Sequence, residues 1–147
     1  MDRVIVSRSE SETEAVALDL AVNLTIGDVV LIDGDLGAGK TVFVRGLAQG
    51  LGAASAEVSS PTFTLVHEYR GGRVTLYHAD LYRLDRAAVA DLGLEELAAE
   101  GVLAVEWPDR FADPGPSPVC VQIDAVEEDE NLRRITIGRQ DDRAVSV

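Results

Sequence analysis

The stretch GDLGAGKT, from Gly34 to Thr41, constrains the fold of this chain more than any other part of its sequence. Its spacing, G-x-x-x-x-G-K-[ST], is that of a phosphate-binding loop, in which glycines let the backbone wrap closely around an anion. The apolar run VVLI at residues 29–32 precedes it, and apolar residues at helical spacing follow up to Gly52, where a helix would end. Strand, loop and helix in this order predict an α/β domain that binds a nucleotide.

The residue types of the loop fit the chemistry of a bound nucleoside triphosphate. Lys40 would bring a positive charge to the β- and γ-phosphates, Thr41 would bring a hydroxyl to Mg²⁺, and the helix that begins there would add the positive end of its dipole. The alternative is a glycine-rich turn with an exposed lysine, which would make the agreement of motif and context a coincidence. The candidate phosphate site therefore consists of Gly34, Asp35, Leu36, Gly37, Ala38, Gly39, Lys40, Thr41 and Val42.

Length and charge limit what else the chain can be. Its 147 residues are enough for one domain with a substantial core, and no internal boundary or repeat divides residues 1–147. The 26 acidic residues outnumber 13 basic ones, and the net charge of −13 argues against direct binding to DNA or RNA. A single cysteine excludes an internal disulfide, and the sequence has no signal-peptide core or membrane-spanning apolar stretch. We expect a cytoplasmic protein without membrane contact.

The first half of the chain predicts antiparallel as well as parallel strands. A short strand at residues 4–6 leads to an S-x-x-E capping box, Ser11 with Glu14, which predicts a helix that ends at about Leu24. The later stretch TLVHEYRGGRVTLYHADLYRL predicts a hairpin with a two-residue turn at Gly71-Gly72.

The second half predicts a helical stretch interrupted at Gly93, a buried strand VLAVEW at residues 102–107, and two strands around an acidic turn at residues 119–138. Cys120 is expected as a small core residue in the first of these last strands. We therefore predict a single-domain P-loop NTPase of the α/β class, with a mixed, largely parallel central sheet flanked by helices and an antiparallel C-terminal hairpin.

Two acidic residues compete for the role of Mg²⁺ ligand. Glu106 follows the apolar run VLAV, so buried backbone would hold its carboxylate at the carboxyl edge of the sheet. Asp80 lies in a polar cluster with His78, Tyr82 and Arg83, which would also fit a salt-bridged surface. Metal binding by His78 with Asp80 is a weaker alternative, because no third ligand is evident.

The stretch SSPTFTLV, residues 59–66, is rich in hydroxyl groups. Ser60, Thr62 and Thr64 could face a nucleotide, in a loop that closes on the γ-phosphate and relaxes after hydrolysis. An ordinary serine-proline turn into a strand explains the same residues, and this stretch alone leaves both interpretations open.

Four blocks, GDLGAGKT, SSPTFTLV, HADLYRL and VEWPDRF, occur in this order within one short chain. Together they resemble the bacterial TsaE family, the ATPase component of the system that makes threonylcarbamoyladenosine in tRNA. The resemblance extends to about Phe111, and the stretch after Pro114 matches no specific feature. One departure is Ala79, where the third block of the family usually has a bulkier residue.

The resemblance implies roles for single residues. It implies that the phosphate loop binds ATP, that Thr41 and Glu106 hold Mg²⁺, and that Asp80 positions or activates the attacking water. Thr62 resembles the switch residue near the γ-phosphate, and Trp107 belongs to the same functional edge. The family also contacts adenine through an N-terminal segment, for which the candidates here are Ser7, Ser11 and Thr13.

The resemblance further implies an ATPase that binds the TsaB–TsaD complex, resets it between turnovers and meets tRNA only through it. TsaD is the subunit that transfers the threonylcarbamoyl group. Hydrolysis needs more positive charge than Lys40 and Mg²⁺ supply, and Arg83 is the better internal candidate for it, with Arg45 the poorer. If neither reaches the phosphates, hydrolysis by the chain alone should be slow and a partner should accelerate it.

Two other functions remain open at this point. A small-molecule kinase would need an acceptor pocket and an arginine-bearing lid, for which only Arg83 and Arg86 stand in a suitable place. A nucleotide-gated binding module would use ATP to order its switch region, with hydrolysis incidental.

Overall fold

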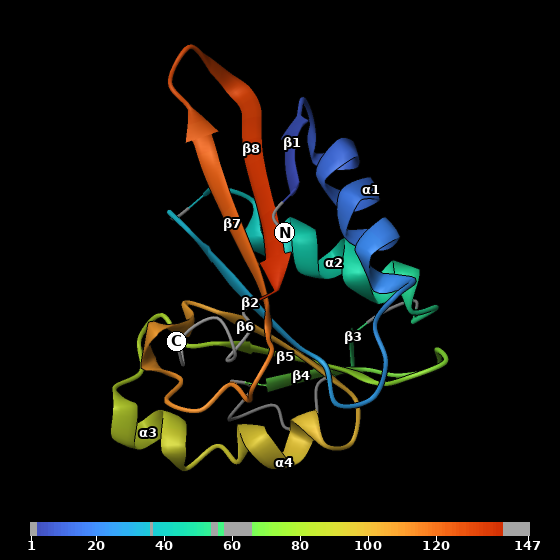
Figure 1. Ribbon diagram of the computed structural model, residues 1–147, viewed down its shortest axis with the longest axis vertical. Coiled ribbons are helices and arrows are strands. Elements are labelled where there is room, and N and C mark those ends of the chain that lie inside the picture. The colour runs from blue at the N-terminus through green and yellow to red at the C-terminus, as the bar shows by residue number, and fades with distance from the viewer. Residues whose placement is uncertain (1–2, 36, 54–55, 58–65, 140–147) are drawn as a thin grey trace, which may run out of the picture.

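The structure, a computed structural model, describes residues 3–35, 37–53, 56–57 and 66–139. In these residues the chain forms an eight-stranded sheet with the strand order β1-β8-β7-β2-β6-β5-β4-β3 (Figure 1). The strands are β1 Arg3–Ser7, β2 Val29–Gly34, β3 Ala56–Glu57, β4 Val66–Tyr69, β5 Leu76–Asp80, β6 Val102–Glu106, β7 Val119–Val126 and β8 Asp129–Arg139. The helices are α1 Glu10–Ala21, α2 Lys40–Gly50, α3 Arg86–Ala90 and α4 Leu94–Ala98, with a 3-10 turn at Pro108–Arg110.

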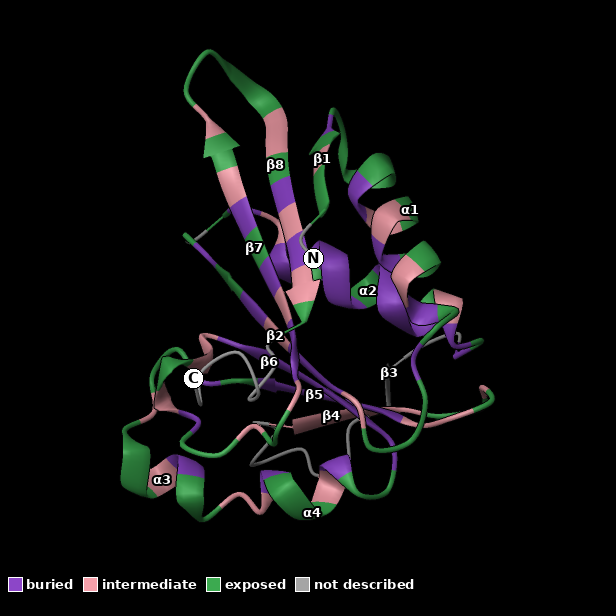
Figure 2. Cartoon of the chain, viewed as in Figure 1, coloured by how far each residue is buried: buried purple, intermediate pink, exposed green. Residues whose placement is uncertain are grey.

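The sheet is parallel in its centre and antiparallel at both sides. Strands β7, β2, β6 and β5 pair in parallel, whereas β8 and β1 on one side and β4 and β3 on the other add antiparallel strands. The predicted α/β fold with a mixed sheet and an antiparallel C-terminal hairpin is confirmed. All residues of β6 are buried, as a central parallel strand requires when helices cover both faces (Figure 2).

Two apolar cores lie on opposite faces of this sheet. Because strand side chains alternate between faces, Val30 and Ile32 of β2 pack with helices α1 and α2, while Leu103 and Val105 of β6 pack with α3 and α4. The four parallel strands are therefore fixed from both sides. Their carboxyl ends form a rigid edge, which is where ligands bind in open α/β sheets.

Helix α1 begins earlier than the sequence suggested. Its N-cap is Ser9, whose hydroxyl accepts a hydrogen bond from the backbone N–H of Glu12 at 3.1 Å. The Glu12 carboxylate in turn accepts from the N–H of Arg8 at 2.8 Å. The S-x-x-E pattern occurs twice in this stretch, and the predicted pair, Ser11 with Glu14, is the wrong copy. The first copy caps the helix and also binds the short connection from β1 through the N–H of Arg8.

The hairpin of β4 and β5 is confirmed, but its predicted two-residue turn is wrong. Residues 70–75 separate the paired strands, and Gly71-Gly72 is only part of this longer loop. The loop is held against the helices that precede it: the N–H of Arg73 donates to the carbonyl of Leu51 at 3.0 Å, and its guanidinium donates to a carbonyl of α1 at 2.6 Å. These tertiary contacts determine the turn, and a local pattern does not show them.

Three further expectations from the sequence concern Gly93, Cys120 and Ala79. The break at Gly93 is confirmed, with a φ of 68° between α3 and α4. Cys120 is only half-buried, so it is not the core residue that was expected. Ala79 is fully buried in the core beside α3 and α4, in agreement with a packing role for that position. Among the described residues, no helix has the length and apolarity that a bilayer crossing would require.

Gly46 of α2 lets helices α1 and α2 approach each other closely. A Cβ at this position would overlap the backbone carbonyl of Glu14 and lie 2.7 Å from the Cβ of Ala17. We expect Gly46→Ala to lower the free energy of unfolding by about 1–3 kcal/mol, because overpacking outweighs the roughly 1 kcal/mol that alanine gains in helix propensity. Urea denaturation measures this change, with the exposed Gln49→Ala on the same helix as the control. A Gly46→Ala variant as stable as wild type would contradict the packing account.

Candidate nucleotide-binding site

The phosphate-loop sequence lies where β2 ends, at the carboxyl edge of the parallel strands. Gly37 and Gly39 have φ angles of 79° and 110°, which favour glycine, and α2 begins at Lys40. At Gly34 a Cβ would overlap the backbone carbonyl oxygen of Ile123 on β7. The glycines are therefore used as the motif predicts, to bend the chain tightly into the N-terminus of a helix.

Lys40 is buried, with 5% of its surface exposed. Its ammonium donates hydrogen bonds to the backbone carbonyls of Gly34 and of Asp35, the latter at 3.0 Å. It also lies 3.9 Å from the ring centroid of Trp107, a cation–π distance. A buried positive charge is thus held directly at the loop by neutral groups.

Trp107 follows Glu106 at the end of β6. It is the one non-glycine among the described residues with a positive φ, 58°, a conformation that costs energy and is often found at functional sites. Its ring stacks at a tilt against Tyr82, with centroids 4.9 Å apart. The strand end therefore turns its indole toward the lysine, in agreement with the expected place of Trp107 on the functional edge.

Glu106 connects the loop to the neighbouring strand. The hydroxyl of Thr41 donates to its Oε2 at 3.2 Å, and Nε2 of His78 lies 2.5 Å from the same oxygen. Both Glu106 and His78 are buried, with 3% and 6% of their surface exposed. When Glu106 is ionised, His78 is the donor in this pair, which fixes the orientation of the carboxylate.

The oxygens of Thr41 and Glu106 fit a Mg²⁺ ion. Mg²⁺ prefers hard oxygen ligands, and it usually takes only one or two from protein and the rest from water and phosphates. In the described part of the chain, no group of three or more His, Cys, Asp or Glu side chains could hold a metal ion. The weaker alternative of His78 with Asp80 thus gains no third ligand, whereas a site completed by a nucleotide suits Thr41 and Glu106.

Asp80 lies directly opposite Glu106 in the register of β5 and β6. It is exposed, and its Oδ1 accepts a hydrogen bond from the N–H of Tyr82 at 3.1 Å. Asp80 therefore lies on the strand next to Glu106, and among the described residues it forms no ion pair. The residues that share one pocket of about 310 Å³ include Gly37, Gly39, Lys40, Thr41, Val42, Asp80, Glu106 and Trp107.

Other candidates lie elsewhere. Arg83 is exposed on a separate hollow that it shares with Arg86. Arg45 is paired with Glu14 of α1 at 3.7 Å. Ser11 is exposed on α1 and lines neither pocket beside the loop.

Thr13 is buried, its hydroxyl shares a 2.7 Å hydrogen bond with that of Ser7, and it lines a second pocket, of about 160 Å³, beside the loop. Leu36 and residues 59–65 of the hydroxyl-rich stretch, Thr62 among them, lie outside the described residues.

Sequence analysis missed one residue of this region, Arg133 of β8. Its guanidinium reaches the loop, with Nε donating to the carbonyl of Ala38 at 3.0 Å and Nη2 to that of Gly37 at 3.4 Å. The available signal was the alternation of β8: Arg133 has the same parity as Ile135 and Ile137, which are buried. An arginine on the core-facing side of a strand needs specific partners.

The surroundings of His67 and Tyr69 on β4 shift the pKa of each side chain. Burial lowers the pKa of His67, and the neighbouring His78, 6.0 Å away between ring centroids, lowers it further. Burial raises the pKa of Tyr69, Arg45 lowers it, and the charge of Glu106 adds to the increase. Both shifts favour the neutral form of the side chain.

Removing the His78 side chain tests the buried pair. We expect His78→Ala to lower the free energy of unfolding by about 3 kcal/mol, because it leaves the Glu106 carboxylate buried with only Thr41 as a described partner. Urea denaturation at pH 7 gives the value, and His67→Ala, which removes the half-buried neighbouring ring, is the matched control. An equal loss of unfolding free energy in the two variants would show that the contact of His78 with Glu106 contributes nothing beyond the packing of the ring.

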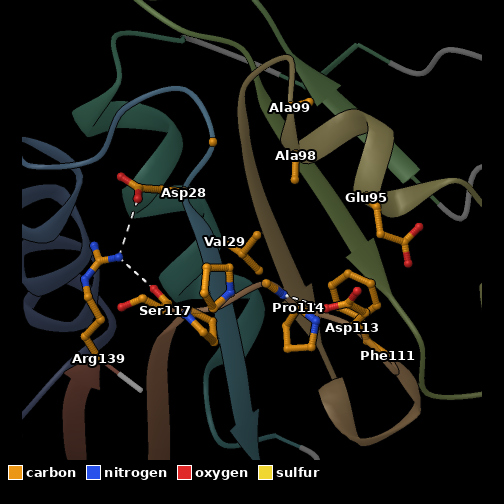
Figure 3. Close-up of a pocket in the computed structure, with 14 residues that line it drawn as sticks. Asp28, Val29, Glu95, Ala98, Ala99, Phe111, Asp113, Pro114, Ser117 and Arg139 are labelled. Carbon is orange, nitrogen blue, oxygen red and sulfur yellow. Dashed lines mark hydrogen bonds and ion pairs between the residues drawn. The ribbon is translucent and has the colours of Figure 1, made fainter. Parts of the chain in front are cut away.

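A different hollow, of about 430 Å³, lies at the amino end of β2, away from the loop (Figure 3). Phe111 and the prolines of residues 114–118 line it. Arg139, which also lines this hollow, already has partners there. Its guanidinium lies 3.5 Å from a carboxylate oxygen of Asp28 and donates to the carbonyl of Ser117 at 2.7 Å. Volume therefore does not select the candidate site, which we place where the loop, the lysine and the carboxylates line one pocket.

Comparisons with known proteins point to one family. The family model described as "Threonylcarbamoyl adenosine biosynthesis protein TsaE" matches residues 7–135. The "tRNA threonylcarbamoyladenosine biosynthesis protein TsaE" of Nostoc is 44% identical over 116 residues, which cover 76% of this chain and 70% of that protein. The protein of the same name from Aquifex aeolicus is 39% identical over 137 residues, 92% of this chain and 96% of that one.

The crystal structure of YdiB from Bacillus subtilis superposes on this chain with a TM-score of 0.77 at 32% sequence identity. The superposition covers 99% of this chain and 90% of the YdiB chain. The matched range of the family model contains the loop, the ends of β5 and β6, and Arg133.

Proposed function

This chain belongs to the TsaE family of threonylcarbamoyladenosine biosynthesis proteins, and we propose that it serves this biosynthesis by binding and hydrolysing Mg·ATP. One observation carries the proposal: Lys40, Thr41, Asp80 and Glu106 line a single pocket at the N-terminus of α2. A cation, a hydroxyl and two carboxylates beside backbone N–H groups are the parts that phosphoryl transfer requires.

The loop would bind the triphosphate. The N–H groups at the start of α2 have no partner within the helix, and together with the helix dipole they favour an anion there. Lys40 is held by two backbone carbonyls and the Trp107 ring. These neutral partners are weaker than phosphate oxygens, so the ammonium can turn to the β- and γ-phosphates when ATP binds.

Thr41 and Glu106 would hold Mg²⁺, which supplies positive charge to the β- and γ-phosphate oxygens when bound. His78 keeps the Glu106 carboxylate in place through its hydrogen bond to Oε2. Asp80 is left to orient the attacking water from the adjacent strand. A carboxylate is a weak base for water, so we assign Asp80 orientation rather than proton abstraction.

A partner completes the site in this proposal. Among the described residues no arginine lines the pocket that contains Asp80 and Glu106, since Arg83 faces a separate hollow. Hydrolysis by the chain alone should then be slow. We propose that the chain works in the cytoplasm by binding the TsaB–TsaD complex, which accelerates hydrolysis and is reset by it, and that it meets tRNA only through this complex.

Trp107 provides a direct test of nucleotide binding, because it is the single tryptophan of the chain. We expect Mg·ATP to change its fluorescence saturably, since the ammonium of Lys40 leaves the ring for the phosphates. Chelation of Mg²⁺ should weaken the binding by about tenfold or more, which corresponds to at least 1.4 kcal/mol. The absence of a saturable change, together with no heat of binding in calorimetry, would contradict the proposal.

A further inference from the structure

Arg133 joins the β7–β8 hairpin to the phosphate loop. Its Nε and Nη2 donate to the loop carbonyls of Ala38 and Gly37, at 3.0 and 3.4 Å. Its Nη1 donates to the carbonyls of Glu130 and Leu132 at 2.7 and 2.8 Å. One side chain thus binds four backbone carbonyls, two in the loop and two in its own hairpin.

The position of Arg133 on β8 brings its side chain close to the loop. Side chains alternate along β8, so Arg133 continues the row of Ile135 and Ile137, which are buried under α1 and α2. Among the described residues, no carboxylate forms an ion pair with it. Its partners are neutral carbonyls, so a full positive charge remains beside the phosphate loop.

The contact with Ala38 has a consequence for the loop amides. The peptide that joins Ala38 to Gly39 is trans, since the described residues contain no cis peptide. In a trans peptide the C=O and N–H point in opposite directions. By holding the Ala38 carbonyl, Arg133 therefore turns the N–H of Gly39 to the opposite side of the loop, away from the hairpin.

We infer that Arg133 is a positioning residue of the nucleotide site, which holds the loop carbonyls and thereby orients the loop amides for the phosphates. The second pocket supports this assignment, because Arg133 lines it together with Gly37, Ala38 and Gly39. The inference rests on the proposed function. It also gives a role to the C-terminal hairpin, where the sequence contained no recognisable motif.

The test compares Arg133→Ala, Arg133→Lys and Arg134→Ala in their affinity for Mg·ATP and for inorganic tripolyphosphate, measured by calorimetry. Arg134 is the matched control: it is the next residue of β8, carries the same charge, and is exposed. We expect Arg133→Ala to bind both ligands about tenfold more weakly or worse, and Arg134→Ala to stay within about twofold of wild type. Lysine can hold one carbonyl but lacks the planar fork, so Arg133→Lys should recover only part of the loss.

Tripolyphosphate separates phosphate binding from contacts with the base, and urea denaturation of each variant separates it from unfolding. If Arg133→Ala does not fold, the comparison of Arg133→Lys with wild type decides. If wild type fails to bind Mg·ATP, the proposed function falls and this inference with it. If wild type binds while the Arg133 variants bind equally tightly, or Arg134→Ala loses as much, the inference alone is overturned.

Discussion

Lys40→Ala is expected to abolish measurable ATP hydrolysis and to weaken Mg·ATP binding by about a hundredfold. Lys40 is the only cationic side chain among the described residues that line the pocket with Asp80 and Glu106. Two charge-assisted hydrogen bonds to phosphate of about 1.5 kcal/mol each amount to about 3 kcal/mol, and each 1.4 kcal/mol is a factor of ten in affinity. Calorimetry and phosphate release measure the two effects.

The control for this variant is Arg45→Ala. Arg45 lies on the same helix and also carries a positive charge, but it is exposed and pairs with Glu14. Its removal should leave affinity within about twofold, since surface pairs contribute little. Thermal unfolding of both variants verifies that they are folded. If Lys40→Ala binds Mg·ATP as tightly as wild type, the ammonium does not contact the phosphates and the site is wrongly assigned.

Asp80→Asn is expected to separate hydrolysis from binding. Asparagine keeps the shape of the side chain and an oxygen that can accept from the N–H of Tyr82, so the strand end should remain intact. Removal of the charge that orients the water should lower the hydrolysis rate by about a hundredfold, the cost of a misplaced reactant. The affinity for Mg·ATP should change by less than about threefold, because Asp80 contacts neither the loop nor Thr41 among the described interactions.

Glu106→Gln is the matched comparison on the opposite strand. It removes the proposed Mg²⁺ ligand, so it should weaken binding of Mg·ATP as well as hydrolysis. This variant should bind ATP equally well with and without Mg²⁺. Single-turnover phosphate release and calorimetry distinguish the two variants. An Asp80→Asn variant that hydrolyses ATP at the wild-type rate would remove Asp80 from the mechanism.

The parts of the site that the sequence predicts are those that local chemistry determines. Gly37 and Gly39 have the positive φ angles that only glycine adopts readily, and the spacing of the loop encodes this requirement. Glu106 could be placed because four apolar residues before it read as a buried strand, and a buried strand must end at an edge of the sheet. Its 2.5 Å contact with His78 could not be predicted, since it depends on the pairing of β5 with β6.

The predictions that failed depend on tertiary contacts. The hairpin turn is longer than its glycines suggest because Arg73 binds the end of α2. The N-cap is Ser9, and its partner Glu12 also binds the N–H of Arg8 in the connection from β1. Arg133 belongs to no motif, and only its place in the alternation of β8 distinguishes it from Arg134. Its contact with the loop depends on the pairing of β7 with β2 and of β8 with β7, which a local pattern does not show.

The most direct test of the central claim is phosphate release from Mg·ATP by the wild-type chain, alone and with purified TsaB and TsaD. We predict slow release by the chain alone and a several-fold increase with the pair. We also predict that Lys40→Ala and Glu106→Ala lose both. Tight ATP binding without release, and without stimulation by the pair, would contradict the partner-dependent ATPase. It would favour a nucleotide-gated binding module or a kinase that lacks its acceptor.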